Sequence, residues 1–488
     1  MKRTIIIGAG IGGLFAGNLL AQKGHKVTIF ESHSMPGGYT AGFWRNGFYF
    51  ESGTISFEAS SLVFKAMKEI GVFEKIGFIR HNPIRFVSRD YSGTPKTYEE
   101  FKNMFYNAYP SERARLARYF AEVDTMYRVM KSLSSTGSVL SKIVSGSKAL
   151  TLFQKYNRIT LNQFTERYFE KDSRLYRIFT SLGYPDMAPF ILGGAVLSLF
   201  EDYWRVRDGM QSWADVLNDN FQKLGGELKL NSYVDKVLTR NRTALGVRCK
   251  QSEYEADYVI AANDYKKTFL QLLDRSDIPQ ALYTKIQNTN VSEGMCVVYL
   301  GLNLSNEELQ RAMQSSYVMY IDLSVNVDIH NSNDRDYFKK TGFSLFSPSI
   351  DNPKLAPEGK SSLMISTIAP YHWMNNWGGN DRQTYLQLKE DVINTLINRA
   401  SFVIPNLQNV ITFKDAATPP TFERYTHNTD GATSAWSWNP QNRFYKNFWS
   451  FKVTTPVKNL FIGSCWATQI GGIPGALGAA SRCVKKIT

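Results

Sequence analysis

The amino-acid sequence predicts an α/β fold: a Rossmann-like nucleotide-binding domain built from discontinuous segments, plus a mixed α+β domain for a substrate. Residues 4–31 follow the order strand, glycine-rich turn, helix, strand, which is the pattern of a dinucleotide-binding unit. Residues 211–262 change from helix to alternating strands, and residues 459–488 form a strand, a glycine-rich turn and a helix. A chain of 488 residues is expected to form two domains.

The order of these patterns predicts that the two domains are interleaved. We expect the nucleotide-binding domain to comprise residues 1–85, 205–268 and 445–488. The substrate domain is expected to comprise residues 86–204 and 269–444, inserted between those pieces.

The first insertion is predicted to be helical because its apolar residues recur three and four positions apart. Residues 101–131 alternate arginines with apolar side chains. This pattern fits either attachment to an anionic membrane surface or a packed helical subdomain with a solvated face, and both interpretations stay open. Residues 132–148 are rich in serine and glycine and predict a mobile loop or lid.

Composition narrows the class of protein. Lys and Arg number 57 against 43 Asp and Glu, which gives a formal charge of +14, but the chain has no long basic run, so we expect no nucleic-acid partner. Aromatic residues make up 14% of the chain, which favours a large apolar ligand and a membrane-facing surface. The 4 cysteines are widely spaced and form no Cys-x-x-Cys pair, so we expect a reducing compartment and no metal site.

No stretch reaches the roughly 18 apolar residues that a spanning helix needs. We therefore expect a cytoplasmic protein, with peripheral attachment to the inner face of the membrane as an open alternative.

The first motif is GAGIGG at residues 8–13, placed between an expected strand at residues 4–7 and an expected helix at residues 14–23. In such a turn one glycine allows the tight bend, one lets the backbone approach a pyrophosphate, and one lets helix and strand pack closely. The helix N-terminus then presents free N–H groups to the phosphates. Glu31 ends the second strand, where a carboxylate can bind a ribose 2′-hydroxyl. This acid favours FAD or NAD over NADP.

Three later segments complete the predicted cofactor site. A second glycine pair lies at residues 36–40 and is followed by FESGT at residues 50–54. A middle segment runs from residue 208 to the strand before Asn263 and includes Val234. The last strand ends at Gly463, and Pro474 is expected to occupy the first position of the final helix. The N-terminus of that helix can stabilise negative charge on a reduced flavin ring.

Together the four segments resemble the flavoprotein superfamily of amine oxidases and phytoene desaturases. The last of them resembles most closely the C-terminal signature of phytoene desaturases, carotenoid isomerases and retinol saturases. The resemblance implies non-covalent FAD and a long apolar substrate whose C=C bonds undergo desaturation, saturation or cis–trans isomerisation at flavin N5. The predicted cofactor-binding residues are Gly8, Gly10, Ile11, Gly12, Gly13, Glu31, Gly37, Gly38, Tyr39, Gly53, Thr54, Val234, Asn263, Gly463, Gly472, Ile473 and Pro474.

The sequence departs from this family at two places. Tyr39 stands where relatives usually carry an arginine, so no contact between a charge and a phosphate is assigned there. Residues 435–438 (AWSW) stand where the family usually has a Tyr-Gly pair, which implies a differently shaped pocket; Trp436 and Trp438 are expected in the pocket wall or the core.

Candidate catalytic residues are less sharply defined. Glu201, Tyr203, Arg205, Tyr425 and His427 are candidate proton donors, together with Asp202, and an ordinary surface or hydrogen-bonding role is the alternative for each. Cys465 lies beside the last flavin segment, but the usual context for a covalent thioether is missing.

Several functional alternatives remain at this level. An amine or protoporphyrinogen oxidase would use the same FAD segments, and GDP-dissociation inhibitors share the fold without FAD. Because the chain carries a single dinucleotide fingerprint, NAD(P)H is expected only as a transient partner, with a quinone or oxygen as the other redox partners to consider.

Overall fold

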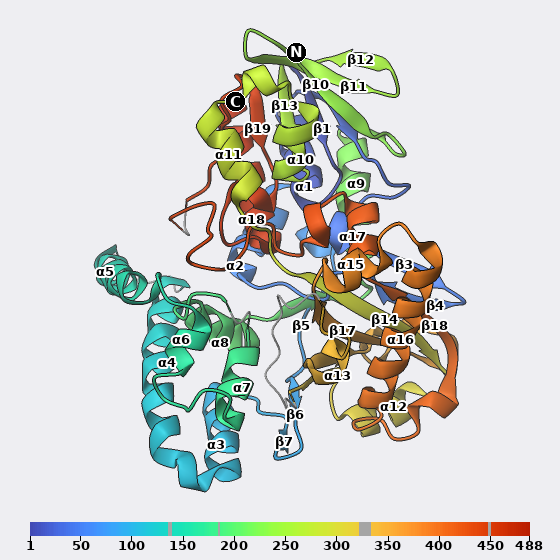
Figure 1. Cartoon of the computed structure of the whole chain (residues 1–488). Coiled ribbons are helices and arrows are strands. Elements are labelled where there is room, and N and C mark those ends of the chain that lie inside the picture. Colours follow the sequence, from blue (N-terminus) through green and yellow to red (C-terminus); the bar gives the residue numbers. More distant parts are fainter. Residues whose placement is uncertain (135–138, 184–185, 322–332, 448–449) are drawn as a thin grey trace.

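The computed structural model describes residues 1–134, 139–183, 186–321, 333–447 and 450–488. A five-stranded parallel sheet occupies the end of the molecule at which both termini lie (Figure 1). Its strand order is β19-β13-β1-β2-β9, so neighbouring strands come from three distant parts of the chain. Strands β1, β13 and β19 are short and mostly apolar, as expected for a parallel sheet covered on both faces, whereas the edge strand β9 is polar. Their bounds are β1 (Arg3–Ile7), β2 (Lys26–Phe30), β9 (Glu227–Lys229), β13 (Tyr258–Ala261) and β19 (Leu460–Ile462).

Three helices pack around this sheet and against one another: α1 contacts both α18 and α9. The predicted α/β class is therefore confirmed. A three-stranded antiparallel sheet, β10-β11-β12, extends the same end of the molecule. The bounds are α1 (Ile11–Gln22), α9 (Met210–Lys223), α18 (Gly472–Ile487), β10 (Val234–Arg240), β11 (Thr243–Cys249) and β12 (Ser252–Glu255), with α2 (Ser60–Glu69), α10 (Tyr265–Lys267) and α11 (Gln280–Asn288) nearby in Figure 1.

The second large sheet of the structure is mixed and has seven strands, in the order β18-β14-β17-β16-β15-β6-β7. The strands are β18 (Ile411–Ala417), β14 (Gly294–Leu302), β17 (Ser361–Ala369), β16 (Phe343–Phe346), β15 (Tyr317–Tyr320), β6 (Arg85–Val87) and β7 (Ser92–Gly93). Helix α16 (Arg382–Ala400) packs on β17 and β18. Other elements here are α12 (Asn306–Met313), α13 (Tyr337–Lys340), α14 (Pro348–Asp351), α15 (Trp373–Gly378) and α17 (Pro419–Thr426).

Two short antiparallel pairs connect these regions: the hairpin β3 (Gly42–Arg45) with β4 (Phe48–Glu51), and β5 (Phe78–Arg80) with β8 (Trp204–Val206). A helical region stands beside the mixed sheet (Figure 1). It contains α3 (Tyr98–Ala108), α4 (Arg113–Ser134), α5 (Val139–Tyr156), α6 (Leu161–Thr165), α7 (Arg174–Ser181) and α8 (Ile191–Glu201).

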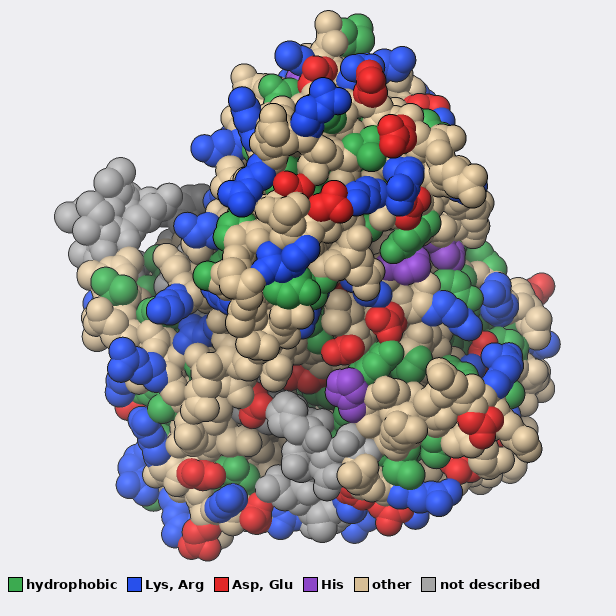
Figure 2. Space-filling view, turned by 45° about the horizontal axis from the view of Figure 1, so that its top comes forward, with side chains coloured by type: hydrophobic (Ala, Val, Ile, Leu, Met, Phe, Trp, Pro, Cys, Tyr) green, Lys and Arg blue, Asp and Glu red, His purple; other side chains and the backbone are tan. Residues whose placement is uncertain are grey.

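The side chains of α4 bear on the two interpretations of residues 101–131. Leu116, Phe120 and Met126 are buried in the core of the helical region, with at most 2% of each exposed. The apolar half of the alternating pattern thus packs inward, which favours the packed subdomain. None of the described helices is long and apolar enough to cross a bilayer. Lys and Arg side chains are spread over the face in Figure 2 and interspersed with acidic ones.

The core of the parallel sheet extends beyond the predicted domain boundaries. Phe269, Ile286, Trp436 and Phe444 all belong to this core, although the sequence placed them in the substrate domain. The cause is packing: the apolar side of α11 and the Trp436–Phe444 stack, with ring centroids 3.9 Å apart, cover the same sheet. The division into two domains stays a prediction, and its boundaries at 268/269 and 444/445 do not mark an edge of this core.

Three local predictions were wrong. The first helix begins at Ile11 instead of residue 14, because Gly10 adopts the extended conformation of an N-cap residue. The final helix begins at Gly472, so Pro474 is its third residue and not its first. Most of the predicted loop at residues 132–148 is helical, since α4 ends at Ser134 and α5 begins at Val139. The part of that loop at residues 135–138 lies outside the described residues.

Glu51 ties two cofactor segments together at the end of β4. Its carboxylate accepts hydrogen bonds from the first amide of α9, Met210 N (3.0 Å), and from the Tyr49 hydroxyl (2.8 Å). Only 2% of the residue is exposed. Burial raises the pKa of Glu51 to about 8, although these hydrogen bonds oppose the rise.

This raised pKa makes the stability of the protein pH-dependent. Between about pH 4.5 and 8 the folded state keeps a proton on Glu51 that the unfolded state releases. The free energy of unfolding is therefore expected to fall by a few kcal/mol as the pH rises through this window. Urea unfolding of the parent and of Glu51→Gln, measured across that range, checks this. The variant should show a flatter profile, and parallel profiles would contradict the expectation.

Candidate functional site

A cavity of about 670 Å³ lies where the parallel sheet meets α17 and the β3–β4 hairpin. It brings together residues from all four predicted cofactor segments. The predicted residues that line it are Gly8, Gly10, Ile11, Gly12, Glu31, Gly37, Gly38, Tyr39, Thr54, Val234, Asn263, Gly472 and Ile473. Glu31 and the start of α18 thus lie in one cavity, which the predicted cofactor site requires.

The remaining predicted residues, Gly13, Gly53, Gly463 and Pro474, do not line the cavity, and the three glycines among them lie in closely packed positions. A side chain at Gly13 would overlap the carbonyl oxygen of Gly8, and one at Gly53 would come within 2.6 Å of the Tyr39 ring. A side chain at Gly463 would overlap Ile260 in the sheet. Their role is close packing, which explains why glycine stands at these positions.

The two glycine turns are packed backbone against backbone. Gly8 has a φ of 101°, and Gly37 has a φ of 129°, values that L side chains rarely adopt. The amide of Gly37 donates to the carbonyl oxygen of Ala9 at 2.9 Å. A Cβ at Gly10 would have nothing within 4 Å, so the backbone at the start of α1 faces open cavity. This geometry fits a pyrophosphate approaching the N-terminus of a helix.

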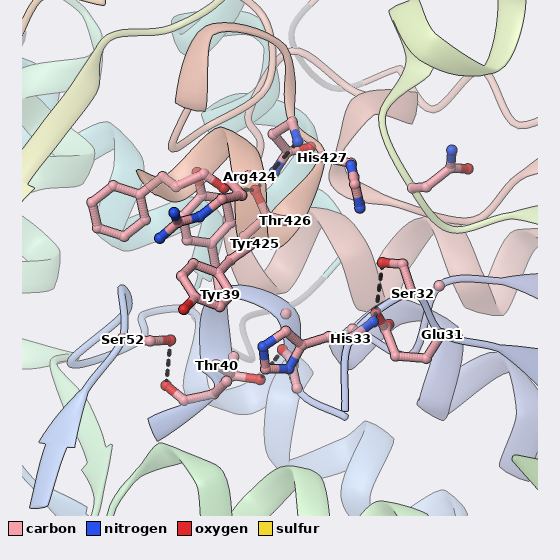
Figure 3. Close-up of a pocket in the computed structure, with 18 of the residues that line it drawn as sticks. Glu31, Ser32, His33, Tyr39, Thr40, Ser52, Arg424, Tyr425, Thr426 and His427 are labelled. Carbon is pink, nitrogen blue, oxygen red and sulfur yellow. Dashed lines mark hydrogen bonds between the residues drawn. The ribbon is translucent and has the colours of Figure 1, made fainter. Parts of the chain in front are cut away.

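Glu31 holds the first glycine turn in place from the end of β2 (Figure 3). One of its oxygens accepts from Ala9 N at 2.7 Å, and the other accepts from His33 N at 2.8 Å and Ser32 Oγ at 3.1 Å. Its carboxylate nonetheless lines the cavity. It is thus placed both to order the turn and to accept a hydrogen bond from a ribose hydroxyl, and the residues present fit FAD.

The other end of the cavity is formed by the last segment. The Ser464 hydroxyl donates to the carbonyl oxygen of Asn263 at 2.9 Å and joins the third segment to the fourth. Gly471 has a φ of 67°, and a side chain there would meet the carbonyl oxygen of Ser434 at 2.6 Å. This turn leads into α18, whose first residues line the cavity with their backbone. The free N–H groups of that first turn can stabilise negative charge.

An aromatic wall continues the cavity beyond the cofactor segments. The Tyr39 hydroxyl donates to the carbonyl oxygen of Gly431 at 3.1 Å, and its ring stacks on Phe422 with centroids 5.8 Å apart. Further along, Phe43 meets Tyr299 edge to face at 5.0 Å. Sequence reasoning missed Phe43, Tyr299 and Phe422, because β3, β14 and α17 come together only in the folded chain. The mixture of aromatic faces suits an apolar ligand.

Two of the predicted catalytic candidates line the cavity. Tyr425 is 48% exposed, and its ring contacts His33 at 5.2 Å. His427 contacts Tyr233 at 5.0 Å, and burial together with the nearby Lys267 lowers the pKa of its imidazole. His427 is therefore neutral at pH 7 and able to accept a proton.

Glu201 and Tyr203 do not belong to the described residues that line this cavity. Glu201 forms an ion pair with Lys131 at 2.7 Å and accepts a hydrogen bond from Tyr127. Burial acts to raise the pKa of Glu201, but these two hydrogen bonds outweigh it and lower the pKa. Glu201 is thus ionised at pH 7, an environment that favours the hydrogen-bonding alternative, and its role as a proton donor stays a prediction. The Tyr203 ring packs against His81 at 5.0 Å.

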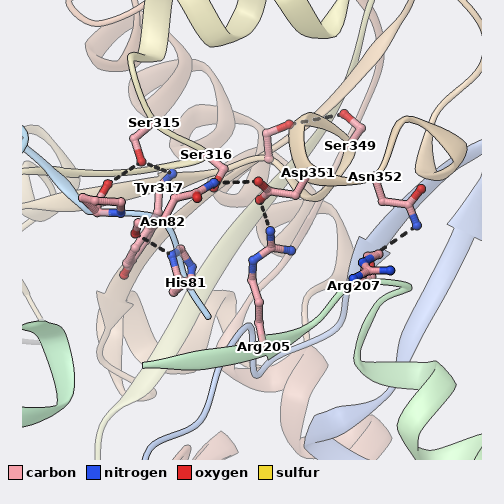
Figure 4. A network of polar contacts seen from close by, with 12 residues as sticks. His81, Asn82, Arg205, Arg207, Ser315, Ser316, Tyr317, Ser349, Asp351 and Asn352 are labelled. Atoms are coloured by element: carbon pink, nitrogen blue, oxygen red, sulfur yellow. Dashed lines mark hydrogen bonds and ion pairs between the residues drawn. The ribbon is translucent and has the colours of Figure 1, made fainter. Parts of the chain in front are cut away.

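Arg205 belongs to a polar network between β8 and α14 (Figure 4). Its guanidinium forms a buried ion pair with Asp351, which also accepts from Asn82 at 2.7 Å. Asn352 links the same loop to Asp208 at 2.9 Å. This geometry favours a structural role for Arg205, which links β8 to α14 beside the mixed sheet, and its role as a proton donor stays a prediction.

Removing Arg205 is expected to be costly for stability. Arg205→Ala leaves the Asp351 carboxylate buried without its cation, which costs about 3–5 kcal/mol. Denaturant unfolding measures this loss, with the exposed neighbour Arg207→Ala as the matched control, expected within about 0.5 kcal/mol of the parent. Equal stabilities of the two variants would show that the pair does not hold the sheets together.

Cys465 lines the cavity, so its reactivity bears on how a flavin is held. Burial, with a smaller contribution from Asp264, raises the pKa of its thiol to about 12. The thiolate needed for a thioether is thus scarce at pH 7. We expect acid denaturation to release all flavin from the precipitated protein, measured by absorbance of the supernatant. Flavin that stays with the pellet, and is lost in Cys465→Ser, would contradict this.

Comparison with known proteins agrees with this geometry. The family model described as flavin containing amine oxidoreductase matches residues 11–488. A 4,4′-diapophytoene desaturase from Methylomonas sp is 27% identical over 91% of this chain and 88% of that protein. An all-trans-retinol 13,14-reductase from Danio rerio is 25% identical over 98% and 85%. A chloroplastic prolycopene isomerase from Daucus carota is 24% identical over 88% and 71%.

Solved structures show the same fold. An oxidoreductase from Methanosarcina mazei matches with a TM-score of 0.67 at 14% identity, covering 99% of this chain and 100% of the other. A putrescine oxidase bound to putrescine matches with a TM-score of 0.66 at 14% identity, covering 100% and 98%.

The fold and the cavity define an FAD-dependent oxidoreductase, and the predicted cofactor and enzyme class are confirmed. The chain belongs to the family of flavin-containing amine oxidoreductases. Within it, the resemblance to phytoene desaturases, carotenoid isomerases and retinol saturases is also confirmed.

Proposed function

We propose that this protein acts on the C=C or C–C bonds of a polyunsaturated apolar lipid of the carotenoid or retinoid type. The observation that carries the proposal is the resemblance, over at least 88% of the chain, to three proteins whose names describe desaturation, reduction and isomerisation of such lipids. The cavity supports it, because its cofactor segments lead directly into an aromatic wall.

We propose that the predicted cofactor residues bind different parts of FAD. The two glycine turns and the first turn of α1 receive the pyrophosphate, Glu31 receives the adenosine ribose, and Val234 lies beside the adenine. The first turn of α18 backs the ring end. Bound FAD supplies the chemistry of hydride acceptance and donation at flavin N5.

The wall residues are proposed to keep the lipid in a dry environment. Phe43, Tyr299 and Phe422 offer ring faces without charge. Among the described lining residues the carboxylates are Glu31, engaged with the glycine turn, and Asp415, which pairs with Lys389 at 2.7 Å. Two histidines, His33 and His427, also line the cavity, and we propose His427, whose pKa is lowered by burial, as the proton acceptor.

The direction of the reaction depends on the redox partner. Desaturation needs an acceptor such as a quinone or oxygen, saturation needs a donor such as transiently bound NAD(P)H, and isomerisation needs no net electron transfer. Incubating oxidised and chemically reduced enzyme with a panel of polyenes, followed by mass spectrometry and chromatography, separates these outcomes.

A loss or gain of two hydrogens, or a new isomer of the same mass, supports the proposal. The Gly10→Ala variant, expected to lack FAD, is the control. The proposal would be contradicted if the enzyme left every polyene unchanged in both redox states. If such an enzyme formed peroxide with an amine or a porphyrinogen, the oxidase alternative would take its place.

We also propose a cytoplasmic location with peripheral contact to an anionic membrane, from which an apolar substrate is drawn. The formal charge of +14 supports this attraction. Sedimentation with vesicles containing anionic lipid should carry the protein down at low salt, and neutral vesicles should not. Equal recovery in both supernatants would contradict it.

A further inference from the structure

The cofactor segments bring no positive side chain to the cavity. Between Glu31 and the end of the second glycine turn the sequence has no lysine or arginine, and Tyr39 takes the position where relatives usually carry one. The described lining residues of the first and last segments have none either. FAD nevertheless carries a pyrophosphate with two negative charges. Backbone N–H groups at a helix N-terminus provide only partial charge, so a cation from elsewhere in the cavity would strengthen the binding of the pyrophosphate.

Every cation that lines the cavity among the described residues comes from outside those segments. They are Arg45, Lys267, Arg382, Lys389 and Arg424. Two of them are already neutralised, since Lys267 pairs with Glu423 at 3.0 Å and Lys389 pairs with Asp415 at 2.7 Å. The three arginines form no ion pair with any described carboxylate.

Position distinguishes Arg424 from the other two arginines. Arg424 lies on α17, the helix that contacts the second glycine turn: Phe422 stacks on Tyr39 at 5.8 Å, and Tyr425 meets His33 at 5.2 Å. Figure 3 shows its side chain beside Tyr39, on the wall facing Thr40 and Ser52. The guanidinium lies over the Tyr425 ring, 5.0 Å from its centroid, which orients it.

Arg45 and Arg382 belong to other parts of the wall. Arg45 is on β3, where it lies over the Phe43 ring and donates to its neighbour Trp44 O at 3.0 Å. Arg382 begins α16, which packs on the mixed sheet. Neither element carries a side chain that stacks on the second glycine turn.

We propose that Arg424 binds the pyrophosphate of FAD and replaces, from α17, the arginine that the second glycine turn lacks. The inference rests on the proposed placement of FAD in this cavity. The new element of the proposal is that a residue of α17, the helix that comes directly after β18 in the chain, neutralises charge on the cofactor. FAD would then link the parallel sheet to α17, and part of its affinity would be electrostatic.

The test is the affinity of the apoprotein for FAD, measured by flavin fluorescence at low and high salt. Arg424→Gln is expected to weaken binding about tenfold or more at low salt, where a charge-assisted contact is strongest. The loss should shrink at about 1 M salt, because screening removes the same attraction from the parent. Arg424→Lys should fall in between. Arg382→Gln is the matched control, an exposed arginine on the same cavity, and should bind as the parent does.

Three results would overturn the proposal: parent-like affinity in Arg424→Gln, an equal loss at every salt concentration, or the same loss in Arg382→Gln. An equal loss at all salts would indicate a packing role. Failure of the underlying site placement looks different, because the parent apoprotein would then bind no FAD, or Glu31→Ala would bind it as tightly as the parent.

Discussion

A protein carrying Gly10→Ala is expected to fold normally and to retain less than about a tenth of the parent's FAD, whereas Gly13→Ala is expected to lose about 3 kcal/mol or more of its free energy of unfolding. An added Cβ at Gly10 meets no protein atom within 4 Å, and the φ of −70° suits alanine. The new methyl group projects into the space proposed for the pyrophosphate. At Gly13 the Cβ would overlap the Gly8 carbonyl oxygen and lie 3.2 Å from the Ala262 side chain, so helix and strand must separate.

The expected changes in the free energy of unfolding follow from how tightly each glycine is packed. Overpacking in a tight interior costs about 1–3 kcal/mol or more, and the overlap at Gly13 involves backbone on both sides, which places it at the upper end. Gly10→Ala should change the free energy of unfolding of the apoprotein by no more than about 0.5 kcal/mol. Thermal melts of the apoproteins together with flavin absorbance of the purified proteins measure both quantities. A Gly10→Ala protein that keeps its FAD would show that the phosphates bind elsewhere.

Replacing Glu31 is expected to have the second largest effect. Glu31→Ala removes the acceptor of two backbone amides, Ala9 N and His33 N, and of the proposed ribose hydroxyl. A hydrogen bond to a charged group contributes about 1.5–3 kcal/mol, so loss of the ribose contact alone should lower FAD affinity by about tenfold to a hundredfold. Glu31→Gln keeps one oxygen acceptor and should lose less.

Fluorescence titration of the apoproteins provides the measurement, and Glu227→Gln, an exposed acid at the start of β9, is the control. The account would be contradicted if Glu31→Ala bound FAD within a factor of about two of the parent.

The cofactor segments could be predicted because their physics is local. The Gly8, Gly10 and Gly13 spacing combines a turn, an open approach and a tight crossing within one strand–helix unit, and the structure shows each of these three features at its expected glycine. Glu31 could also be predicted, because it comes directly after the last residue of the neighbouring strand β2. Helix ends were less predictable: Pro474 lies at the third position because the positive φ of Gly471 and Gly472 already starts the turn.

The rest of the site could not be predicted, because it depends on partners far away in the chain. Glu201 looked like a buried acid, but Lys131 comes to it across the α4–α8 contact. Arg205 looked available, but its partner Asp351 comes from α14, which packs on the mixed sheet. Arg424 lies next to the candidate Tyr425 in the sequence, but nothing in the sequence places it beside the second glycine turn. Its importance emerges when the other lining cations are seen to be paired or distant.

The claim on which all of this depends is that one FAD lies in the cavity between Glu31 and the start of α18, without a covalent bond. The most direct measurement is the flavin content of the purified parent and of Gly10→Ala, after denaturation, compared with protein concentration. The parent should release equimolar FAD, and the folded variant almost none. Equal FAD in both, or a folded parent that binds no flavin when FAD is added, would contradict the account.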